Sequence, residues 1–455
     1  MNYKDYFKGK KILVIGLGDE LEMLSEIRFL LKHKAQVLVF DHRSEQRISR
    51  ALIPLKALGV EEIVCGIPLP QNIPQVDMVL VSHSVPYESK ILDRVRAAGI
   101  PIEYPETLVL KLVPSITVIG IVGYAGTSTV THLVSKILDK VFQSRDAEKV
   151  HTINPESQTS TLALLKNIAK GDIVVSRIPE SQARMYVESR ICPHVLVVTS
   201  LQRTVGTHRG SNQTQFSLKE LCGEMLAMQT YNSFLVATDE VIDGLKMHVE
   251  GQRSKILRTG TVVIPQDWFL SVDGQHMREN IALAVRVAEL FKIPLDTSRE
   301  VIEPFTGLKG RLEPVKKPGG GIMAYNDSYS TCMVSVMAAA VTCAADSPVI
   351  LVTGGKGSDI TTQALSFLQS YVSKVIFLPG SSNIRLHKHY ANSDSQYEFA
   401  DSLDDAIRRA YACRNKDQKI VVSPGTEHYG QADSRRDRYE IVQLLLKKHG
   451  QTYQA

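Results

Sequence analysis

The feature that most constrains this chain is a short apolar run that ends in glycines and leads into a helical spacing of apolar residues. It occurs twice. Ile12–Ile15 runs into a glycine turn at Gly16–Gly18, and Ile116–Val122 runs into a second turn at Gly123–Gly126. A buried strand followed by a tight turn and a helix is typical of a βαβ unit, in which helices cover parallel strands. The sequence therefore predicts an α/β fold.

The length of the chain indicates several such units. At roughly 100–200 residues per domain, 455 residues correspond to about two to four domains. We expect a Rossmann-like domain over residues 1–113, a P-loop-like central domain over 114–304 and a doubly wound C-terminal domain over 305–455. The strands behind this division are expected at residues 12–15, 36–40, 77–81, 102–104, 116–122, 173–175, 194–199, 349–353, 374–378 and 419–422.

Composition and charge exclude several classes of protein. Hydrophobic residues make up 44% and charged residues 22% of the chain, close to the soluble globular averages of about 45–50% and about 25%. A disordered, collagen-like or coiled-coil chain is therefore excluded. Lys and Arg number 53 against 48 Asp and Glu, which leaves a net charge of +5, and the positive residues form no block. We expect no nucleic-acid partner.

The sequence also carries no pattern typical of export. Its first residues are polar where a signal peptide needs an apolar run, and its apolar runs fall short of the roughly 18 residues that a membrane helix needs. None of its 6 cysteines forms a C-x-x-C pair, so neither a disulfide framework nor a zinc knuckle is indicated. We expect a soluble, cytoplasmic protein without membrane insertion.

The first glycine turn is an incomplete dinucleotide motif. Gly16 and Gly18 are followed by Asp19 and Glu20 where a pyrophosphate would lie, and two carboxylates oppose an anion at a helix N-terminus. A tight structural turn and a ligand-binding loop both remain open for this segment. Asp41 and Arg43, after the next strand, fit either a nucleotide contact or a solvated loop.

The second glycine turn lies where a phosphate-binding loop should lie, between a strand and a helix. Its backbone N–H groups can cradle an anion. A working P-loop needs a lysine after its last glycine, and here that position is Thr127. Ser128 or Thr129 can offer a hydroxyl to Mg²⁺. Losing one stabiliser of a transferring phosphoryl group typically costs about 10²–10³ in rate, so phosphate binding is expected here more than efficient phosphoryl transfer.

Strands of the third unit end in small polar clusters. Lys356 follows one of these strands and Ser423 follows another. In open parallel sheets, ligands gather at the carboxyl ends of the strands. These two clusters are therefore candidate parts of a site.

The joint order of the motifs resembles the Mur ligase family, and within it the D-glutamate-adding type that acts on UDP-N-acetylmuramoyl-L-alanine in peptidoglycan synthesis. The resemblance covers nearly the whole chain and implies the three-domain Mur-ligase architecture. It rests on residues 15–18, 41–43, 82–86, 123–129, 192–199, 276 with 280, 305–312, 326–328, 354–355, and 423–424 with 438. In this family ATP phosphorylates the substrate carboxylate, the incoming amine attacks the acyl phosphate, and two Mg²⁺ ions neutralise the charge.

The resemblance implies a role for each matching residue. ATP would be bound by Gly123, Gly126, Thr127, Ser128, Thr129, Asn280, Arg311 and Asp327, with Ser128 also facing Mg²⁺. The nucleotide sugar and D-glutamate would be bound by Gly16, Gly18, Asp41, Arg43, Ser84, Asn154, Lys356, Ser423 and Tyr429. Lys219, in carbamylated form, and His208 would be the catalytic residues. The expected cofactors are ATP and Mg²⁺, and the chain is expected to act as a monomer.

Four departures from the family pattern bear on activity. The P-loop lysine is replaced by Thr127, and the Mg²⁺-binding glutamate after the strand at 173–175 is replaced by Arg177, whose charge repels the ion. A second phosphate-facing lysine is replaced by Tyr329, and the histidine-containing segment keeps at most His208. An impaired relative that keeps nucleotide or nucleotide-sugar binding is the favoured hypothesis, and an active D-glutamate-adding ligase is the alternative.

Several of these residues also have ordinary structural explanations. Lys219 fits a solvated lysine on an amphipathic helix, and His208 and His276 fit ordinary polar positions. Tyr429 fits a packing residue, and the segment 326–328 fits a turn at a strand end. Both explanations remain open for each.

Overall fold

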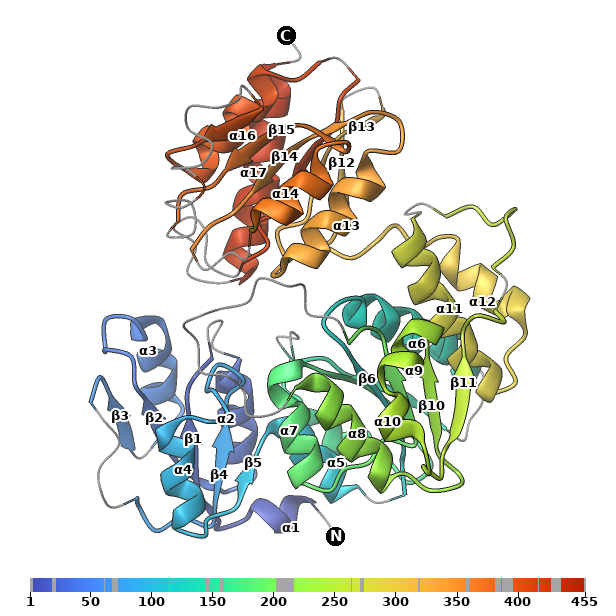
Figure 1. Cartoon of the computed structure of the whole chain (residues 1–455). Coiled ribbons are helices and arrows are strands. Elements are labelled where there is room, and N and C mark those ends of the chain that lie inside the picture. The colour runs from blue at the N-terminus through green and yellow to red at the C-terminus, as the bar shows by residue number, and fades with distance from the viewer. Residues whose placement is uncertain are drawn as a thin grey trace. The chain divides into compact units, whose positions relative to one another are not determined.

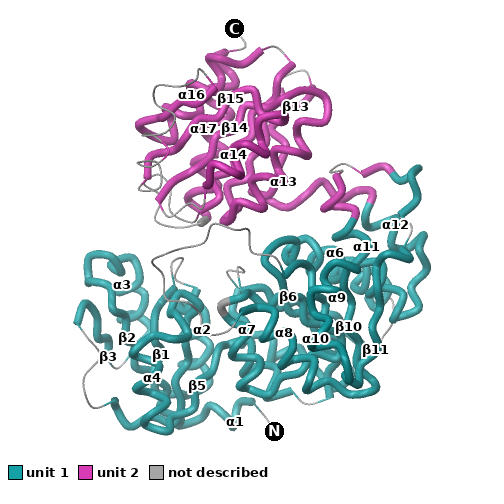
Figure 2. Tube along the Cα trace, in the orientation of Figure 1, with its two compact units in different colours: residues 1–201, 213–268, 279–302 teal, residues 202–212, 269–278, 303–455 magenta. Residues whose placement is uncertain are grey.

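The computed structural model describes residues 3–18, 22–60, 62–67, 73–113, 115–143, 148–155, 159–201, 217–262, 264–270, 274–317, 320–356, 360–380, 386, 396–415, 417–426 and 435–453. The described residues form three β-sheets with helices packed against them, which confirms the predicted α/β class (Figure 1). The chain divides into two compact units, residues 1–201, 213–268 and 279–302, and residues 202–212, 269–278 and 303–455 (Figure 2).

The first sheet is fully parallel and has the strand order β3-β2-β1-β4-β5. Its strands are β1 (Lys11–Ile15), β2 (Gln36–Asp41), β3 (Glu62–Cys65), β4 (Met78–Val81) and β5 (Ile102–Glu103). Its helices are α1 (Tyr3–Phe7), α2 (Met23–Lys32), α3 (Ser49–Ala57), α4 (Lys90–Ala97) and α5 (Pro105–Leu112). The central strand β1 is buried from Ile12 to Ile15, as a strand covered on both faces must be.

The second sheet is also parallel and has the order β11-β10-β9-β6-β8-β7. Its strands are β6 (Thr117–Val122), β7 (Val150–Ile153), β8 (Ile173–Ile178), β9 (Val195–Val198), β10 (Phe234–Ala237) and β11 (Lys255–Arg258). Its helices are α6 (Thr127–Phe142), the 3₁₀-helix η1 (Leu162–Lys166), α7 (Glu180–Glu188), α8 (Leu218–Met228), α9 (Asp239–Gly244), α10 (Lys246–Val249), α11 (Gln275–Leu290) and α12 (Leu295–Ile302). Apolar side chains of the first and second sheets belong to one continuous core cluster.

Strand β8 is longer than the sequence predicts. The expected strand stops at Val175, because Ser176 and Arg177 are polar, but β8 continues to Ile178. The buried Ser176 hydroxyl lies 2.9 Å from the hydroxyl of Tyr186 and is therefore satisfied inside the core. Arg177 consequently lies within the strand, paired in register with Ile121 of β6.

The third sheet has the order β12-β13-β17-β14-β15-β16, and all its pairs are parallel except β12 with β13. Its strands are β12 (Glu313–Lys316), β13 (Ile322–Asn326), β14 (Val349–Thr353), β15 (Val372–Phe377), β16 (Tyr397–Phe399) and β17 (Ile420–Val422). One apolar cluster joins the sheet to α16 (Leu403–Ala412) and α17 (Arg435–Thr452), and another joins it to α13 (Met333–Cys343) and α14 (Thr362–Leu368). This sheet is therefore doubly wound.

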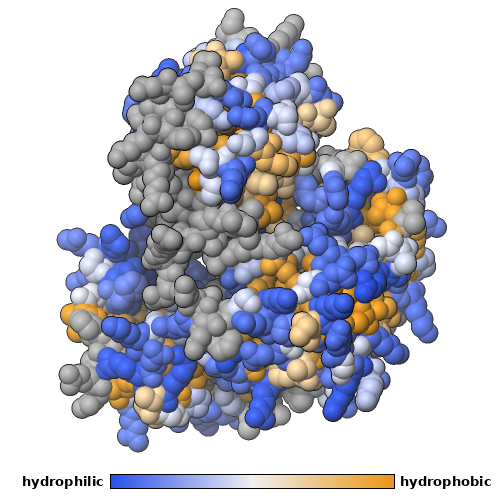
Figure 3. Space-filling view, in the orientation of Figure 1, coloured by the Kyte–Doolittle hydropathy of each residue, from blue (hydrophilic) through white to orange (hydrophobic). Residues whose placement is uncertain are grey.

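The surface is of mixed polarity. Among the residues that Figure 3 colours by hydropathy, hydrophilic ones predominate on the face drawn, and smaller hydrophobic areas lie between them. The most exposed large apolar side chains come from separate elements, such as Ile53 of α3 and Met247 of α10. No helix in the described part of the chain is long and apolar enough to cross a membrane.

Candidate functional site

The second glycine turn has the backbone of an anion-binding loop. It connects β6 to α6, and Gly126 at the N-cap of α6 has a φ of 82°. The left-handed φ at Gly126 favours glycine, and a Cβ there would also collide with Oδ1 of Asn280 unless that side chain moved. No side chain caps the first turn of α6, and the N–H groups of such a turn are available to an anion. The structure thus brings the predicted Asn280 to the loop.

The hydroxyls after Gly126 differ in their surroundings. Thr127 and Thr129 are buried, and the carbonyl of Thr127 accepts a hydrogen bond of 2.7 Å from the Thr131 hydroxyl. Ser128 Oγ is shielded from solvent and has no hydrogen-bond partner among the described residues. A buried polar atom without a partner costs about 1–3 kcal/mol, so this hydroxyl fits a ligand oxygen.

Arg177 reaches the same loop from the neighbouring strand. Its Nε donates a hydrogen bond of 3.2 Å to Oγ1 of Thr127. Thr127 and Arg177, which sequence analysis expects at the positions of the P-loop lysine and the metal-binding glutamate, are therefore in direct contact. A guanidinium stays protonated at any working pH, so the loop carries a fixed positive charge beside its N–H groups.

These residues fit a phosphate and do not fit a divalent cation. The glycine backbone, the Ser128 hydroxyl and the Arg177 charge all favour an anion. Mg²⁺ needs oxygen ligands and commonly carboxylates, and the strand position expected to supply one holds an arginine. Within the described residues, no group of three or more His, Cys, Asp or Glu side chains could hold a metal ion.

A second cluster lies at the carboxyl end of the first sheet. Oδ1 of Asp41 accepts hydrogen bonds from N and Nε of Arg43, both 2.9 Å, and Oδ2 accepts from Leu17 N at 3.0 Å. Arg43 Nη2 also donates to the carbonyl of Gly18 at 3.0 Å. Burial would raise the pKa of Asp41, but the donors from Arg43 and Leu17 hold it below its usual value.

This cluster includes the rest of the predicted first-sheet residues. Gly16 lies against Val85 and Ser84, since a Cβ on Gly16 would collide with Val85 Cγ2 and lie 3.6 Å from Ser84 Oγ. The Ser84 hydroxyl is 3.0 Å from that of Ser82. Gly16, Gly18, Asp41, Arg43 and Ser84 are therefore neighbours, as their assignment to one ligand requires.

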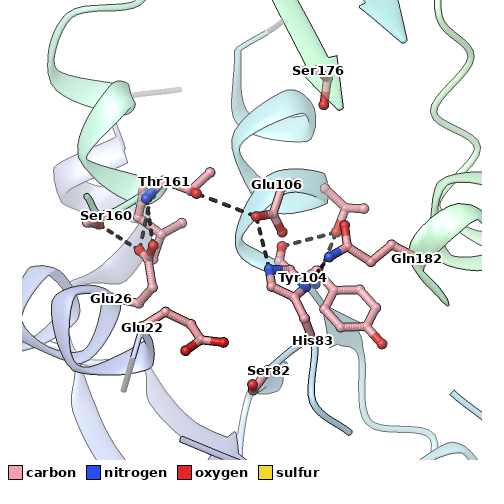
Figure 4. A network of polar contacts seen from close by, with 12 residues as sticks. Glu22, Glu26, Ser82, His83, Tyr104, Glu106, Ser160, Thr161, Ser176 and Gln182 are labelled. Carbon is pink, nitrogen blue, oxygen red and sulfur yellow. Dashed lines mark hydrogen bonds and ion pairs between the residues drawn. The ribbon is translucent and has the colours of Figure 1, made fainter. Parts of the chain in front are cut away.

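Buried carboxylates link the first and second sheets within one compact unit (Figure 4). Glu26 of α2 accepts hydrogen bonds from Ser160 Oγ and Thr161 N, both 2.6 Å, and from Leu162 N at 3.1 Å. Burial raises the pKa of Glu26 to about 7, against the lowering effect of these donors. Glu26 thus fixes the start of η1, in the segment that follows β7 and the half-buried Asn154.

His83 belongs to the same network. Its Nε2 lies 3.2 Å from Glu106 Oε1, its Nδ1 contacts Gln182 Nε2, and its ring stacks on Tyr104 (Figure 4). Burial would lower the pKa of His83, but the charge and hydrogen bond of Glu106 raise it. Sequence reasoning missed Glu26 and Glu106. The available signal was a carboxylate on an otherwise apolar helix face, at position 26 between Leu24 and Ile27.

The predicted residues of the third sheet form a buried cluster around Asp327. Its Oδ2 accepts a hydrogen bond of 2.6 Å from the Ser423 hydroxyl and its Oδ1 accepts one of 3.1 Å from Leu312 N. Burial raises the pKa of Asp327 to about 6, and the nearby Arg311 charge opposes the rise. Lys356 is exposed, and its carbonyl accepts a hydrogen bond of 2.7 Å from the Thr426 hydroxyl.

The structure says little about the predicted catalytic role of Lys219 and His208. Lys219 is exposed in the first turn of α8, where Ser217 and Glu220 form a capping box. His208 and Tyr429 lie outside the described residues.

Comparison with known proteins gives the fold and sequence context. Residues 10–103 match a family model described as the MurD-like N-terminal domain of Mur ligases. The UDP-N-acetylmuramoylalanine–D-glutamate ligase of Bdellovibrio bacteriovorus is 26% identical over 98% of this chain and 99% of its own length. The enzyme of the same name from Caldicellulosiruptor bescii is 25% identical, over 95% of this chain and 96% of its own.

Solved structures share the fold at lower identity. The UDP-N-acetylmuramate–alanine ligase MurC of Thermotoga maritima superposes with a TM-score of 0.60 at 15% identity, over 96% of this chain and 99% of its own. The MurF ligase of the same organism, solved with ADP, superposes with a TM-score of 0.58 at 12% identity, over 99% and 97% of the two chains. This chain is therefore similar in sequence to the MurD-like Mur ligases, over residues 10–103 by the family model and over nearly its full length by the curated relatives, and it shares the fold of the Mur ligases.

Proposed function

We propose that this protein acts in peptidoglycan precursor synthesis as a catalytically impaired relative of the D-glutamate-adding ligases. It keeps the binding of a nucleotide or nucleotide sugar and has lost efficient ATP-dependent ligation. The observation that carries this proposal is the hydrogen bond from Arg177 to Thr127. It puts a fixed cation where the family needs a metal-binding carboxylate, beside a threonine that cannot replace the P-loop lysine.

The charge that develops on the transferring phosphoryl group separates binding from catalysis here. ATP used by this family would supply a phosphoryl group for the substrate carboxylate. Phosphoryl transfer is catalysed chiefly by positioning and by stabilising charge on the phosphoryl oxygens. Arg177 and the first-turn N–H groups of α6 can hold and orient phosphates, but a lysine and a metal-binding carboxylate are both replaced. Binding is therefore retained while the transition state loses stabilisation.

The nucleotide-sugar half of the proposal rests on the first-sheet cluster. Asp41 holds the Arg43 guanidinium in one orientation beside the glycine turn. A preoriented guanidinium suits a phosphate or a carbonyl-rich base, since charge-assisted hydrogen bonds are stronger than neutral ones. We propose a compound like UDP-N-acetylmuramoyl-L-alanine as the ligand of this cluster, with D-glutamate as the family's second substrate.

One observation favours the alternative, an active D-glutamate-adding ligase. Ser128 Oγ is buried without a partner among the described residues, in the place where a P-loop hydroxyl faces Mg²⁺. An intact hydroxyl at this position is what an active enzyme would need. The charge of Arg177 nevertheless opposes a metal there, which is why the impaired function is preferred.

We also propose the three domains 1–113, 114–304 and 305–455, a monomeric state and a cytoplasmic location. Each sheet falls within one of these ranges. The six cysteines are all free of disulfides, which suits a reducing compartment.

The proposal is tested by calorimetry and a phosphate-release assay on the full chain. UDP-N-acetylmuramoyl-L-alanine should bind, while phosphate release with ATP, Mg²⁺ and D-glutamate should stay far below about 1 s⁻¹, the low end of ordinary enzyme turnover. The Bdellovibrio bacteriovorus relative serves as the positive control. Loss of nucleotide-sugar binding, or turnover at the ordinary rate, would contradict the proposal.

A further inference from the structure

We infer that the glycine loop at 123–129 binds the phosphates of a nucleotide without a divalent cation, because the Arg177 guanidinium supplies the positive charge. This inference rests on the proposed function and deepens it. The residues present do not fit the Mg²⁺ that the family uses. The Arg177 guanidinium takes the place of the charge that the metal would supply.

The position of Arg177 follows from strand register. β6 leads directly into the glycine loop, and β8 pairs beside it with Ile121 opposite Arg177 and Val122 opposite Ile178. Arg177 is therefore one residue from the end of β8, and its side chain reaches the first residue of α6. A half-buried side chain held by a strand on one side and a helix start on the other is well placed to meet a phosphate.

The surroundings of the loop offer a phosphate several donors. The first-turn N–H groups of α6 carry no side-chain cap, and Ser128 Oγ has no partner within the described residues. The Thr127 hydroxyl accepts its hydrogen bond from Arg177, which leaves the hydroxyl proton able to donate. Together with the guanidinium, these groups can contact several oxygens of one phosphate.

One carboxylate also approaches the loop. Tyr124, within the loop, donates a hydrogen bond of 3.2 Å to Oε1 of Glu180, the first residue of α7. Glu180 is a carboxylate in contact with the loop, so its contribution to ligand binding must be separated from that of Arg177. Substituting Arg177 and Glu180 separately therefore distinguishes phosphate binding by the arginine from binding that depends on a metal.

The test is equilibrium binding of ADP to the full chain, by calorimetry, once in EDTA and once in Mg²⁺. We expect dissociation constants that agree within about threefold, since the phosphate contacts come from the protein. Arg177→Ala should weaken ADP binding at least about 10-fold, as expected for loss of a charge-assisted contact. Arg177→Lys, which keeps the charge, should retain part of the affinity.

Two controls separate charge from position. Arg258→Ala removes the same charge from β11, at the opposite side of the sheet from β8, and should leave ADP binding unchanged. Glu180→Gln should leave binding unchanged or tighten it. Thermal unfolding of each variant shows that it is folded.

Binding that requires Mg²⁺ and is lost in Glu180→Gln would overturn the inference, as would an unchanged affinity in Arg177→Ala or no ADP binding in either buffer. None of these results decides the proposed function, which is judged separately by nucleotide-sugar binding and by turnover.

Discussion

Arg177 of β8 and Thr127 of α6 are joined by a hydrogen bond from Nε to Oγ1, 3.2 Å long, across 50 residues of sequence. Under the proposed function each residue replaces one that the family pattern expects, and the contact makes the two residues one structural unit. A lysine at 127 would stand beside the Arg177 guanidinium, and a glutamate at 177 would stand beside a threonine. The two substitutions are therefore expected to be energetically coupled, because residues in contact do not act additively.

The double reversion measures this coupling. Thr127→Lys alone brings two cations together, and Arg177→Glu alone leaves the phosphoryl group without its lysine. Neither single change should restore phosphate release with UDP-N-acetylmuramoyl-L-alanine and D-glutamate. The double variant should exceed the product of the two single gains by roughly 2- to 150-fold, the range that coupled neighbours give. Gains that simply multiply would show that the two positions act independently.

Arg43 should contribute directly to nucleotide-sugar binding. Its guanidinium is held by Asp41 beside Gly18, so truncation removes a charge-assisted donor. Arg43→Ala should weaken binding of UDP-N-acetylmuramoyl-L-alanine by about 1–3 kcal/mol in calorimetry. Arg47→Ala, an exposed arginine nearby in sequence, is the matched control and should bind normally. An unchanged affinity in Arg43→Ala would rule out this contact.

Glu26 should make stability depend on pH. Its pKa is about 7 in the folded protein against an ordinary value of 4.5, so the folded state holds the proton over a range in which the unfolded state has lost it. Stability from this group is therefore fully present below pH 4.5 and falls as pH rises toward 7, by about 3 kcal/mol in all. Glu26→Gln has no such proton to lose.

The comparison is made by urea unfolding between pH 5 and 8. The stability of Glu26→Gln relative to the unaltered protein should rise from pH 5 to about pH 7, the folded pKa of Glu26, and level off by pH 8. Glu62→Gln, at an exposed position on β3, should follow the unaltered protein. Parallel pH profiles for Glu26→Gln and the unaltered protein would mean that Glu26 is ionised throughout.

A side chain at Gly126 should lower the free energy of unfolding by more than the left-handed backbone conformation alone explains. Gly126 and Gly171 both have positive φ values, 82° and 95°, but a Cβ meets Asn280 at the first and open space at the second. Gly171→Ala should cost about 1–2 kcal/mol of unfolding free energy. Gly126→Ala should cost at least about 1 kcal/mol more because of overpacking. Equal losses would show that the Asn280 contact is loose.

Local sequence patterns were sufficient for the α/β class and for both glycine turns. Ile12–Ile15 and Ile116–Val122 are apolar runs next to glycines, and such signals lie within a few neighbouring residues. The contact of Arg177 with Thr127 depends on how β8 pairs with β6, which no local pattern encodes. It also depends on β8 continuing through Ser176, a polar residue satisfied by a distant tyrosine.

Buried polar residues were the hardest to predict. Glu26 lies on α2, but its donors come from residues 160–162, in a segment of the other sheet's sequence. A charged residue on an apolar helix face signals a buried partner without saying which one. Sequence analysis likewise assigned Asp327 to ATP and Ser423 to the other substrates. It did not predict that the two side chains form a hydrogen bond with each other.

The most direct test of the account is the turnover of the unaltered protein. Phosphate release is measured with saturating ATP, Mg²⁺, UDP-N-acetylmuramoyl-L-alanine and D-glutamate, beside an active relative. If the proposed function is right, the rate is at least about 100-fold lower than 1 s⁻¹, because the loss of the lysine alone has an effect of this size. Turnover at about 1 s⁻¹ or faster would contradict it and would require another role for Arg177.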